Sequence, residues 1–400
     1  MGESKPSLRI RLSNAAEREV RKGHPWVFES SIRSQNREGT TGELGIIFDK
    51  KNTFMAIGLY DAKSPIRLRV LHCGMPRPID AAFWGAKIEQ AIERRQSVVE
   101  AQTTGLRWIY GENDGWPGLI LDGYADSLVL KIYTAAWLPY LETLVPLFQN
   151  CLGAERLVFR HSRNMEAVSA ANHYRDGQLL VGEAPDGPVR FQESGIWFYA
   201  DLIQGQKTGF FLDQRENRRR VEALAQGHEV LNCFSFSGGF SLYAARGGAR
   251  SVVSVDQSAH ALTELVENWK LNENHSAILN CPHEEVRADV YRWLPDQKKR
   301  YGLVIIDPPS MAPRKADREK AISAYRQLLI DGLRSTEKGG TLVFCSCSAH
   351  VSKEDFIDLA RDVLTRERSR AKITEKTGHA ADHPSRIPEL DYLKALYIQT

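Results

Sequence analysis

Two residues that follow buried strands are placed to do chemistry together. The segment 303–306 is a short, fully apolar run that ends in Asp307 and two prolines. Because proline cannot extend a strand or donate to its ladder, the chain must leave the sheet there. A second apolar run, 341–344, ends in Cys345-Ser346-Cys347-Ser348. One strand end offers a carboxylate and its neighbour a thiol, at the edge where open α/β sheets bind ligands. This pairing indicates chemistry on a nucleobase.

Features upstream of this pair are typical of a site for a nucleoside-like ligand. Residues 230–240 predict a strand, a turn of small residues and the start of a helix, so backbone and helix amino terminus can approach a ligand. Asp256 ends the next apolar strand and can accept hydrogen bonds from both hydroxyls of a ribose. Asp289 follows a further strand and is placed for the exocyclic amine of an adenine. The turn residues that we expect to contact this ligand are Asn232, Phe234, Ser237 and Gly238.

The elements that position these residues predict a multidomain protein. Residues 1–75 contain three predicted strands and are interpreted as all-β, forming a small barrel. Residues 76–204 combine helical spacing with further strands, which predicts a central α+β domain. From 205 to 400 strand and helix alternate, which is typical of a doubly wound α/β sheet of the Rossmann type. Four hundred residues are enough for two or three such domains.

Charge along the chain indicates a basic amino-terminal face. The net charge of +3 is too small to identify a nucleic-acid-binding protein. Its distribution says more, because the first 22 residues set six basic side chains against three acids: Lys5, Arg9, Arg11, Arg18, Arg21 and Lys22. Residues 21–28 place aromatic side chains beside basic ones, a mixture that suits stacking on bases and contact with phosphates. The candidate RNA-binding residues are Arg21, Lys22, His24 and Trp26. The alternatives are a solvated charged surface, and Trp26 and Phe28 as part of the barrel core.

The six cysteines are sparse and have no zinc-site spacing, so no metal is expected. No signal peptide and no apolar run of 18 residues is seen. We therefore expect a cytoplasmic protein with reduced thiols and no membrane partner.

The ordered set of turn, Asp256, Asp289 and Asp-Pro-Pro resembles the class I S-adenosylmethionine-dependent methyltransferases. Together with residues 205–218, the turn 232–239 is similar to one family in particular, the RlmI-type 23S ribosomal RNA cytosine carbon-5 methyltransferases. Further matches cover nearly the whole chain, at 24–28, 111–118, 346–348, 381–384 and 392–394.

This resemblance implies a PUA domain at 1–75, a central α+β domain at 76–204, and a Rossmann-like catalytic domain at 205–400. It implies S-adenosylmethionine as cofactor and ribosomal RNA, of the 23S kind, as partner; a homodimer is left open. It also implies that the segment 207–215 lines the cofactor pocket, through Lys207, Thr208, Phe210, Asp213 and Arg215, with Asp307 nearby.

Methylation at carbon-5 of a pyrimidine accounts for a thiol at this site. A thiolate that adds at carbon-6 of a pyrimidine makes carbon-5 able to attack a sulfonium methyl group. Cys347 lies where the family carries this nucleophile, and Asp307 is expected to hydrogen-bond the ring at N3. The alternative for Cys347 is a buried structural cysteine. Cys345 would share its face if the strand continued. It is then either a second thiol of the site or a packing residue, and we favour packing.

Two departures leave parts of the mechanism open. Many related enzymes carry a second cysteine after the proline turn, where this chain has Ser310 and Met311. In RlmI-type sequences a lysine often follows the two prolines, where this chain has Ser310. The base that removes the carbon-5 proton is not identified, and Asp382 and His383 are candidates only through the resemblance. One alternative function is methylation of another base position in ribosomal or transfer RNA, although Ser310 cannot stack on a base as the aromatic residue of amino-group methyltransferases does. The other is a non-catalytic RNA-binding assembly factor.

Overall fold

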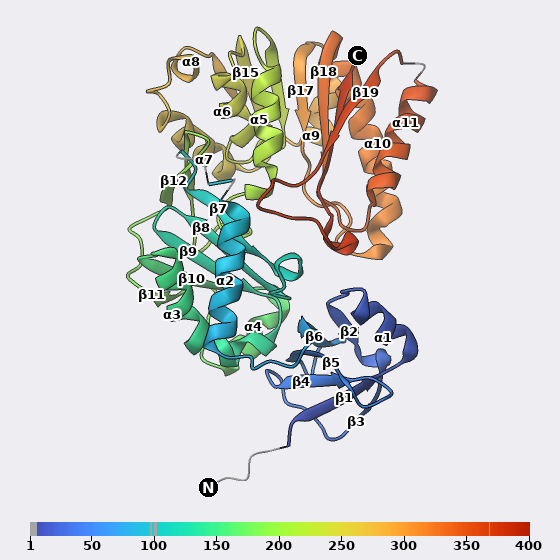
Figure 1. Cartoon of the computed structure of the whole chain (residues 1–400). Helices are drawn as coiled ribbons and strands as arrows, with labels where there is room; N and C mark the ends of the chain where they lie inside the picture. The colour runs from blue at the N-terminus through green and yellow to red at the C-terminus, as the bar shows by residue number, and fades with distance from the viewer. Residues whose placement is uncertain (1–5, 97, 100–101, 368) are drawn as a thin grey trace. The chain divides into compact units, whose positions relative to one another are not determined.

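The computed structural model describes residues 6–96, 98, 99, 102–367 and 369–400, and its elements are shown in Figure 1. The chain forms two compact units. The amino-terminal unit contains residues up to 191 together with 200–210, and the carboxyl-terminal unit contains 192–199 and 211–400. The chain passes between them at the hairpin of β12 (Val189–Glu193) and β13 (Ile196–Ala200). The three-domain division predicted from sequence remains a prediction.

The first sheet of the amino-terminal unit has six strands among the described residues, in the order β2-β6-β5-β4-β1-β3. Its strands are β1 (Leu8–Leu12), β2 (Trp26–Phe28), β3 (Ile32–Gln35), β4 (Leu44–Phe48), β5 (Phe54–Tyr60) and β6 (Ile66–Cys73). The expectation of an all-β segment is wrong at α1 (Asn14–Arg21), which is helical. Ser13 caps it by accepting a hydrogen bond from the N–H of Ala16 at 3.4 Å, and Val20 is its buried residue.

The second sheet of this unit has five strands in the described part of the chain, in the order β11-β10-β9-β8-β7. They are β7 (Gly105–Tyr110), β8 (Leu119–Tyr124), β9 (Ser127–Ile132), β10 (Arg156–His161) and β11 (Gln178–Val181). The helices are α2 (Ala81–Arg95), α3 (Leu141–Leu152) and α4 (Glu166–Ala171). Three buried tryptophans, Trp84, Trp116 and Trp137, pack against one another within the core. These elements confirm the predicted α+β character.

The carboxyl-terminal unit contains a sheet of seven strands within the described ranges, in the order β16-β15-β14-β17-β18-β20-β19. The strands are β14 (Glu229–Cys233), β15 (Ser251–Asp256), β16 (His283–Arg287), β17 (Tyr301–Ile306), β18 (Thr336–Ser346), β19 (Lys372–Thr377) and β20 (Lys394–Gln399). The first five run parallel, and β20 is antiparallel to both β18 and β19. The Rossmann-like sheet predicted from sequence is confirmed.

Helices cover both faces of this sheet (Figure 1). They are α5 (Arg215–Leu224), α6 (Gly239–Arg246), α7 (Ala259–Lys270), α8 (Ser276–Leu279), α9 (Val290–Trp293), α10 (Arg318–Ser335) and α11 (Lys353–Arg366). Every residue of β17 is buried, as expected for a central parallel strand with two covered faces. Across the described residues, no helix is both long and apolar enough to cross a membrane.

Candidate active site

The predicted chemical residues share one edge of the seven-stranded sheet. Strands β14, β15, β17 and β18 are parallel in register, so their carboxyl ends lie together. From β14 the chain proceeds to β15 and β16 on one side, and to β17 and β18 on the other. Such a reversal of strand order opens a crevice beyond the strand ends, where ligands bind in this class of sheet. The fold therefore gathers the turn after β14, Asp256, Asp307 and Cys347 around one site.

The turn after β14 adopts a conformation that few sequences tolerate. Phe234 and Phe236 have φ angles of 60° and 47°, and Gly238 has a φ of 84°. Left-handed backbone at a bulky residue is unfavourable and persists only when its surroundings hold it. Asp256 provides that hold, because its Oδ2 accepts a hydrogen bond from the N–H of Phe236 at 2.9 Å. A side chain at Gly238 would also collide with Leu265, because its Cβ would stand 2.6 Å from the Leu265 Cγ.

Polar atoms in this turn fit a nucleoside-like cofactor. Among the described residues, Asn232 Oδ1, Ser235 Oγ and Ser237 Oγ are buried and make no hydrogen bond within the protein. Buried polar groups are normally satisfied, so this cluster of unsatisfied oxygens beside a helix start suits a polar ligand. Asp256 is only partly buried, and its two oxygens each accept one backbone hydrogen bond, from Phe236 and Ser258. A carboxylate has further acceptor capacity on both oxygens, which two ribose hydroxyls can use.

Asp289 lies two residues beyond β16 and caps α9. Its Oδ1 accepts a hydrogen bond from the N–H of Tyr291 at 3.0 Å. The ring of Tyr291 packs edge-on against that of Phe234, with centroids 5.5 Å apart. Tyr291 is 41% exposed and was not singled out from the sequence. Its position two residues after a predicted adenine-binding acid was the available signal, because aromatic side chains often pack on nucleobases.

Asp307 is oriented by a chain of amide side chains that the sequence did not reveal. Gln214 Nε2 donates to Asp307 Oδ2 at 2.9 Å. Asn217 Nδ2 in turn donates to Gln214 Oε1 at 2.6 Å, and Thr377 Oγ1 donates to Asn217 Oδ1 at 2.5 Å. Gln214 belongs to the segment 205–218 that marks the family, but neither composition nor spacing distinguishes it from its neighbours. This chain of hydrogen bonds fixes the orientation of the Gln214 amide, so that its Nε2 points at Oδ2 of Asp307.

The two candidate thiols have different environments. Cys345 lies within β18 and is fully buried, and burial raises the pKa of its thiol well above the usual value, with a further contribution from Asp307. Strand β18 ends at Ser346, so Cys347 lies past the strand and is partly exposed. Its Sγ is 3.7 Å from the carbonyl oxygen of Pro308. The strand does not continue as the shared-face argument assumed, and of these two thiols only that of Cys347 is both accessible and next to the Asp-Pro-Pro turn.

The predicted residues of the segment 207–215 fall in different environments. Thr208 Oγ1 donates to Asp122 Oδ2 at 2.5 Å, inside the amino-terminal unit, where Phe210 also packs against Phe191. Lys207 has a left-handed φ of 55° in the same unit. Asp213 and Arg215 belong to the carboxyl-terminal unit. A role of all five in cofactor binding remains a prediction.

Arg215 is held by a buried ion pair. Its Nη2 lies 2.5 Å from Asp382 Oδ1, and both side chains are almost completely buried. Asp382 Oδ1 is also 2.9 Å from His383 Nδ1. Tyr392 donates a hydrogen bond to Asp213 Oδ2 at 2.5 Å. These contacts join the segment 382–392 to α5 and the turn before it, and they give Asp382 a structural partner, which does not favour it as the proton-abstracting base.

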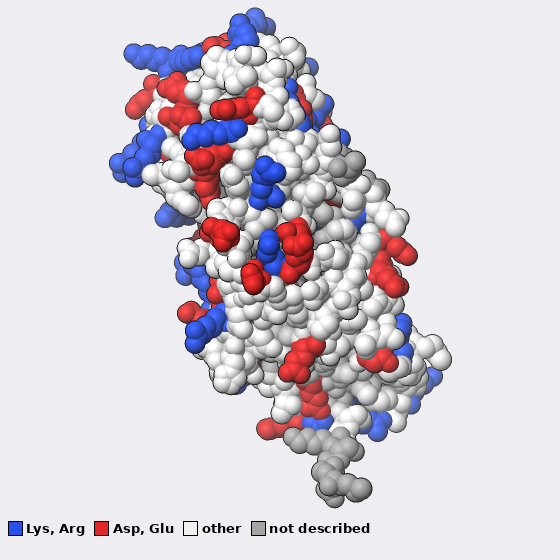
Figure 2. Space-filling model, turned by 90° about the vertical axis from the view of Figure 1, so that its left-hand side faces the viewer, with Lys and Arg blue, Asp and Glu red and all other residues white. Residues whose placement is uncertain are grey.

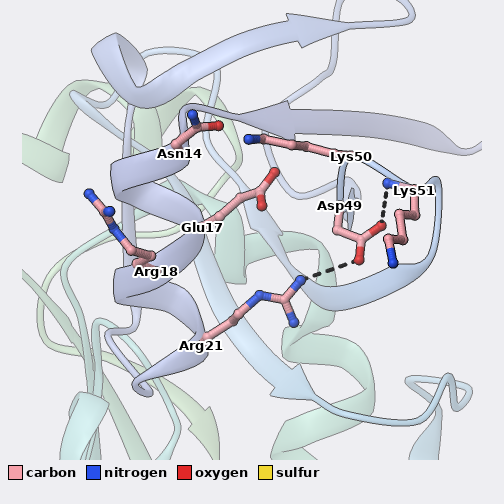
Figure 3. A pocket seen from close by; sticks show the side chains of 7 residues that line it. All are labelled: Asn14, Glu17, Arg18, Arg21, Asp49, Lys50 and Lys51. Carbon is pink, nitrogen blue, oxygen red and sulfur yellow. Dashed lines mark hydrogen bonds and ion pairs between the residues drawn. The ribbon is translucent and has the colours of Figure 1, made fainter.

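Basic residues of the amino-terminal unit line a surface pocket on α1 and the turn between β4 and β5 (Figure 3). Its lining has four cations and two carboxylates: Arg18, Arg21, Lys50, Lys51, Glu17 and Asp49, together with Asn14. Arg21 reaches Asp49 at 3.3 Å, whereas Arg18 points away from the turn. The face drawn in Figure 2 instead carries interspersed basic and acidic side chains. Lys50 and Lys51 were not predicted from sequence, because only folding brings their turn beside α1.

The other predicted RNA-binding residues are used partly within the protein. Trp26 Nε1 donates to Glu112 Oε1 at 2.8 Å, and His24 packs edge-on against the Trp26 ring. Lys22 pairs with Glu19 at 2.9 Å on the exposed side of α1. Lys5 lies outside the described residues. No group of three or more His, Cys, Asp or Glu in the described ranges could hold a metal ion.

Comparison with known proteins gives consistent matches over the whole chain. A family model of S-adenosylmethionine-dependent methyltransferases matches residues 141–398, and a model of PUA-like domains matches 10–72. A ribosomal RNA large subunit methyltransferase of Deinococcus radiodurans is 50% identical over 99% of this chain and 98% of that protein. Ribosomal RNA large subunit methyltransferase I of Shewanella denitrificans is 32% identical over 98% of both chains. A solved structure described as a SAM-dependent methyltransferase of Streptococcus mutans superimposes with a TM-score of 0.80, at 18% identity, over 98% of this chain and all of that one.

Proposed function

Since this chain belongs to the S-adenosylmethionine-dependent methyltransferases, among the ribosomal RNA large subunit methyltransferases, we propose that it methylates carbon-5 of a cytosine in 23S ribosomal RNA. The family gives the cofactor and the class of RNA. The 23S identity of the RNA and the position on the base are the proposed parts. The observation that supports the position on the base is the partly exposed Cys347, which follows β18 directly and lies against the Asp-Pro-Pro turn after β17.

The proposed reaction uses Cys347 as a covalent nucleophile. Addition of its thiolate to carbon-6 forms a carbon–sulfur bond and moves an electron pair to carbon-5. Carbon-5 then takes the methyl group, which the bound cofactor supplies. Loss of the carbon-5 proton to an acceptor and expulsion of the thiolate restore the aromatic ring and the free cysteine. A thiol is needed for this route and has no part in methylation of an exocyclic amine.

Asp307 is proposed to hold the target ring while charge develops on it. A hydrogen bond to N3 stabilises the adduct, provided that the carboxyl group is already oriented. Gln214 supplies that orientation by donating to Oδ2 of Asp307. Ser310 after the prolines has no aromatic ring to stack on the base. The site thus combines the thiol of Cys347 with the oriented carboxyl group of Asp307. It has no aromatic residue directly after the two prolines.

Trapping of the covalent adduct tests this proposal. Wild-type protein and cofactor should form an adduct with RNA that carries 5-fluorocytosine at the target site, because fluorine replaces the proton that must leave. The adduct should survive denaturing electrophoresis. Cys347→Ala should lose the adduct and turnover while it keeps its cofactor affinity. Cys345→Ala is the matched control and should keep both; full turnover by Cys347→Ala would refute the nucleophile assignment.

The basic pocket on α1 is proposed to contact RNA phosphates through Arg18, Arg21, Lys50 and Lys51, together with the predicted residues Lys22, His24 and Trp26. Its charge is exposed, and phosphate contacts by such side chains release counterions. The triple variant Arg18→Gln, Lys50→Gln and Lys51→Gln should bind ribosomal RNA more weakly. The slope of log affinity against log salt should fall by about 0.7–0.9 for each lost contact.

The matched control removes three exposed cations from the carboxyl-terminal unit: Lys298, Arg300 and Lys338. Fluorescence anisotropy over a salt series measures both variants. Equal salt slopes for the two triple variants would show that the pocket on α1 is an ordinary solvated surface.

A further inference from the structure

Lys394 is a buried lysine next to the proposed nucleophile, and the proposed reaction does not use it. It begins β20, opposite Ser346 of β18, and it is 2% exposed. Its ammonium group donates hydrogen bonds of 2.7 Å to the carbonyl oxygens of Ser348 and Val351. Both carbonyls belong to the segment that follows Cys347. Lys394 therefore fastens this segment to the antiparallel strand β20.

Ser348 fastens the same segment to the Asp-Pro-Pro turn. Its Oγ accepts hydrogen bonds from the N–H groups of Met311 at 3.0 Å and Ala312 at 3.3 Å. It also exchanges a hydrogen bond with the hydroxyl of Tyr325 at 2.9 Å. The segment after Cys347 is thus held in two ways. The side chain of Ser348 binds it to the turn after β17, and Lys394 binds its backbone carbonyls.

The charge of Lys394 is unusual for its surroundings. Burial lowers the pKa of its ammonium group to about 8, and the charged groups that oppose this shift are Cys347, Asp391 and Asp355. A pKa of about 8 still leaves the group mostly protonated at neutral pH. Burial of a cation is costly unless a nearby negative group is paired with it. Among the groups that favour the charged form of Lys394, the thiolate of Cys347 makes the largest contribution.

Acidic groups surround Cys347 on the neighbouring elements. Asp307 after β17 and Cys347 both interact electrostatically with the thiol of Cys345 on β18. The same two groups interact with the hydroxyl of Tyr325 on α10. A neighbouring carboxylate disfavours a thiolate, because like charges repel in a poorly solvated site. Lys394 is the basic group that acts on Cys347 from β20.

We propose that Lys394 is a positioning residue for Cys347, which fixes the segment after the thiol and places a positive charge beside it so that the thiolate forms at neutral pH. This inference rests on the proposed function only in taking Cys347 as the nucleophile. It assigns Lys394 no contact with the RNA. It accounts for a buried lysine whose hydrogen bonds go to the segment that follows the reactive thiol.

Alkylation of Cys347 in the full chain tests the inference without RNA. Iodoacetamide reacts with the thiolate, and mass mapping of peptides gives the rate at Cys347 as a function of pH. Lys394→Gln keeps hydrogen-bond donors but removes the charge, and should slow alkylation at pH 7 about tenfold, with the midpoint of the profile at higher pH. Lys394→Arg should follow the wild-type profile closely. A Lys394→Gln profile that matches the wild type would overturn the proposal.

Two controls separate charge from folding. The exposed Cys151 in the same samples is a reference thiol whose rate should be equal in all variants. Lys376→Gln removes an exposed cation from β19 and should leave the Cys347 profile unchanged. If Lys394→Gln does not fold, the pH profile of Cys347 in the wild type decides, because its midpoint must lie below that of a cysteine in an unstructured peptide. A midpoint at or above that of the peptide would refute the inference.

The inference and the proposed function fail in different ways. Full methyl transfer by Cys347→Ala would remove the nucleophile assignment, while a lysine-dependent alkylation profile would still stand. A Cys347 that is essential but whose alkylation ignores Lys394 would remove only the role of Lys394.

Discussion

Replacement of Asp256 by asparagine should weaken cofactor binding to a degree that follows from its contacts. Asp256 ends β15, and each of its oxygens already accepts one backbone hydrogen bond of 2.9 Å, from Phe236 and from Ser258. Each oxygen keeps one further lone pair for a ribose hydroxyl. Asparagine retains one acceptor oxygen and turns the other into a donor. The variant therefore loses one charged hydrogen bond to the cofactor outright and the charge of the second.

The lost interactions set the size of the effect. A hydrogen bond to a charged group contributes about 1.5–3 kcal/mol. Loss of one such bond corresponds to a factor of roughly 10 to 150 in the dissociation constant. The amide of Asp256→Asn also faces the N–H of Phe236 or Ser258 with a donor, so part of the loss reflects a less well-ordered turn. Because Phe236 has a left-handed φ of 47°, this turn depends on that hydrogen bond.

Isothermal titration calorimetry with S-adenosylmethionine and the full chain measures this change. Asp358→Asn is the matched control, since this exposed aspartate on α11 forms an ion pair with Arg361 one turn further along the same helix. A thermal melt checks that Asp256→Asn is folded. An affinity within twofold of the wild type would refute the assignment of Asp256 to the ribose, and with it the placing of the cofactor over the turn after β14.

Three further outcomes are expected. Iodoacetamide should leave Cys345 unmodified in folded protein, because its thiol is fully buried, and modification of Cys345 before Cys347 on a mass map would contradict the difference in their exposure. Asp382→Asn should lower the free energy of unfolding by about 3–5 kcal/mol in urea titrations, because the buried Arg215 loses its main counter-ion and keeps only the longer pair with the half-exposed Glu216 at 3.7 Å. A loss below about 1 kcal/mol would count against a structural pair. Because the pKa of Lys394 is lowered to about 8 in the folded state, the unfolded state binds more protons above that pH. The stability of wild type relative to Lys394→Met should rise between pH 8 and 10.5, by up to about 1.4 kcal/mol per pH unit; a flat difference would refute the shift.

Local pattern predicted the carboxyl-terminal sheet well. The apolar runs 303–306 and 341–344 lie in β17 and β18, and the acid of 251–256 ends β15. Fully buried parallel strands read as continuous apolar runs, so their sequence signal is strong. The helix α1 was missed because it buries one residue, Val20, and so lacks the repeated apolar spacing that predicts a helix. Its capping residue Ser13 was the remaining local signal.

The candidate site was predicted only in part. Asp256, Asp307 and Cys347 were found because each lies at or just past the end of an apolar strand, and parallel strands bring such ends together. Gln214 was not distinguished, since its role depends on the start of α5 reaching the end of β17 from 93 residues away. Lys50 and Lys51 were not distinguished either, because the turn between β4 and β5 meets α1 only after folding.

The sequence by itself determined the order of motifs, the parallel sheet and the membership of a methyltransferase family. These depend on apolar periodicity and on short motifs, which are local properties of the chain. Only the tertiary structure decided which of two cysteines is accessible, because Cys345 and Cys347 differ in where β18 ends rather than in residue type. It alone also placed Lys394 opposite Ser346, the residue before Cys347, since that pairing joins antiparallel strands that are distant in the sequence. The burial of Lys394 there is likewise a property that no local pattern encodes.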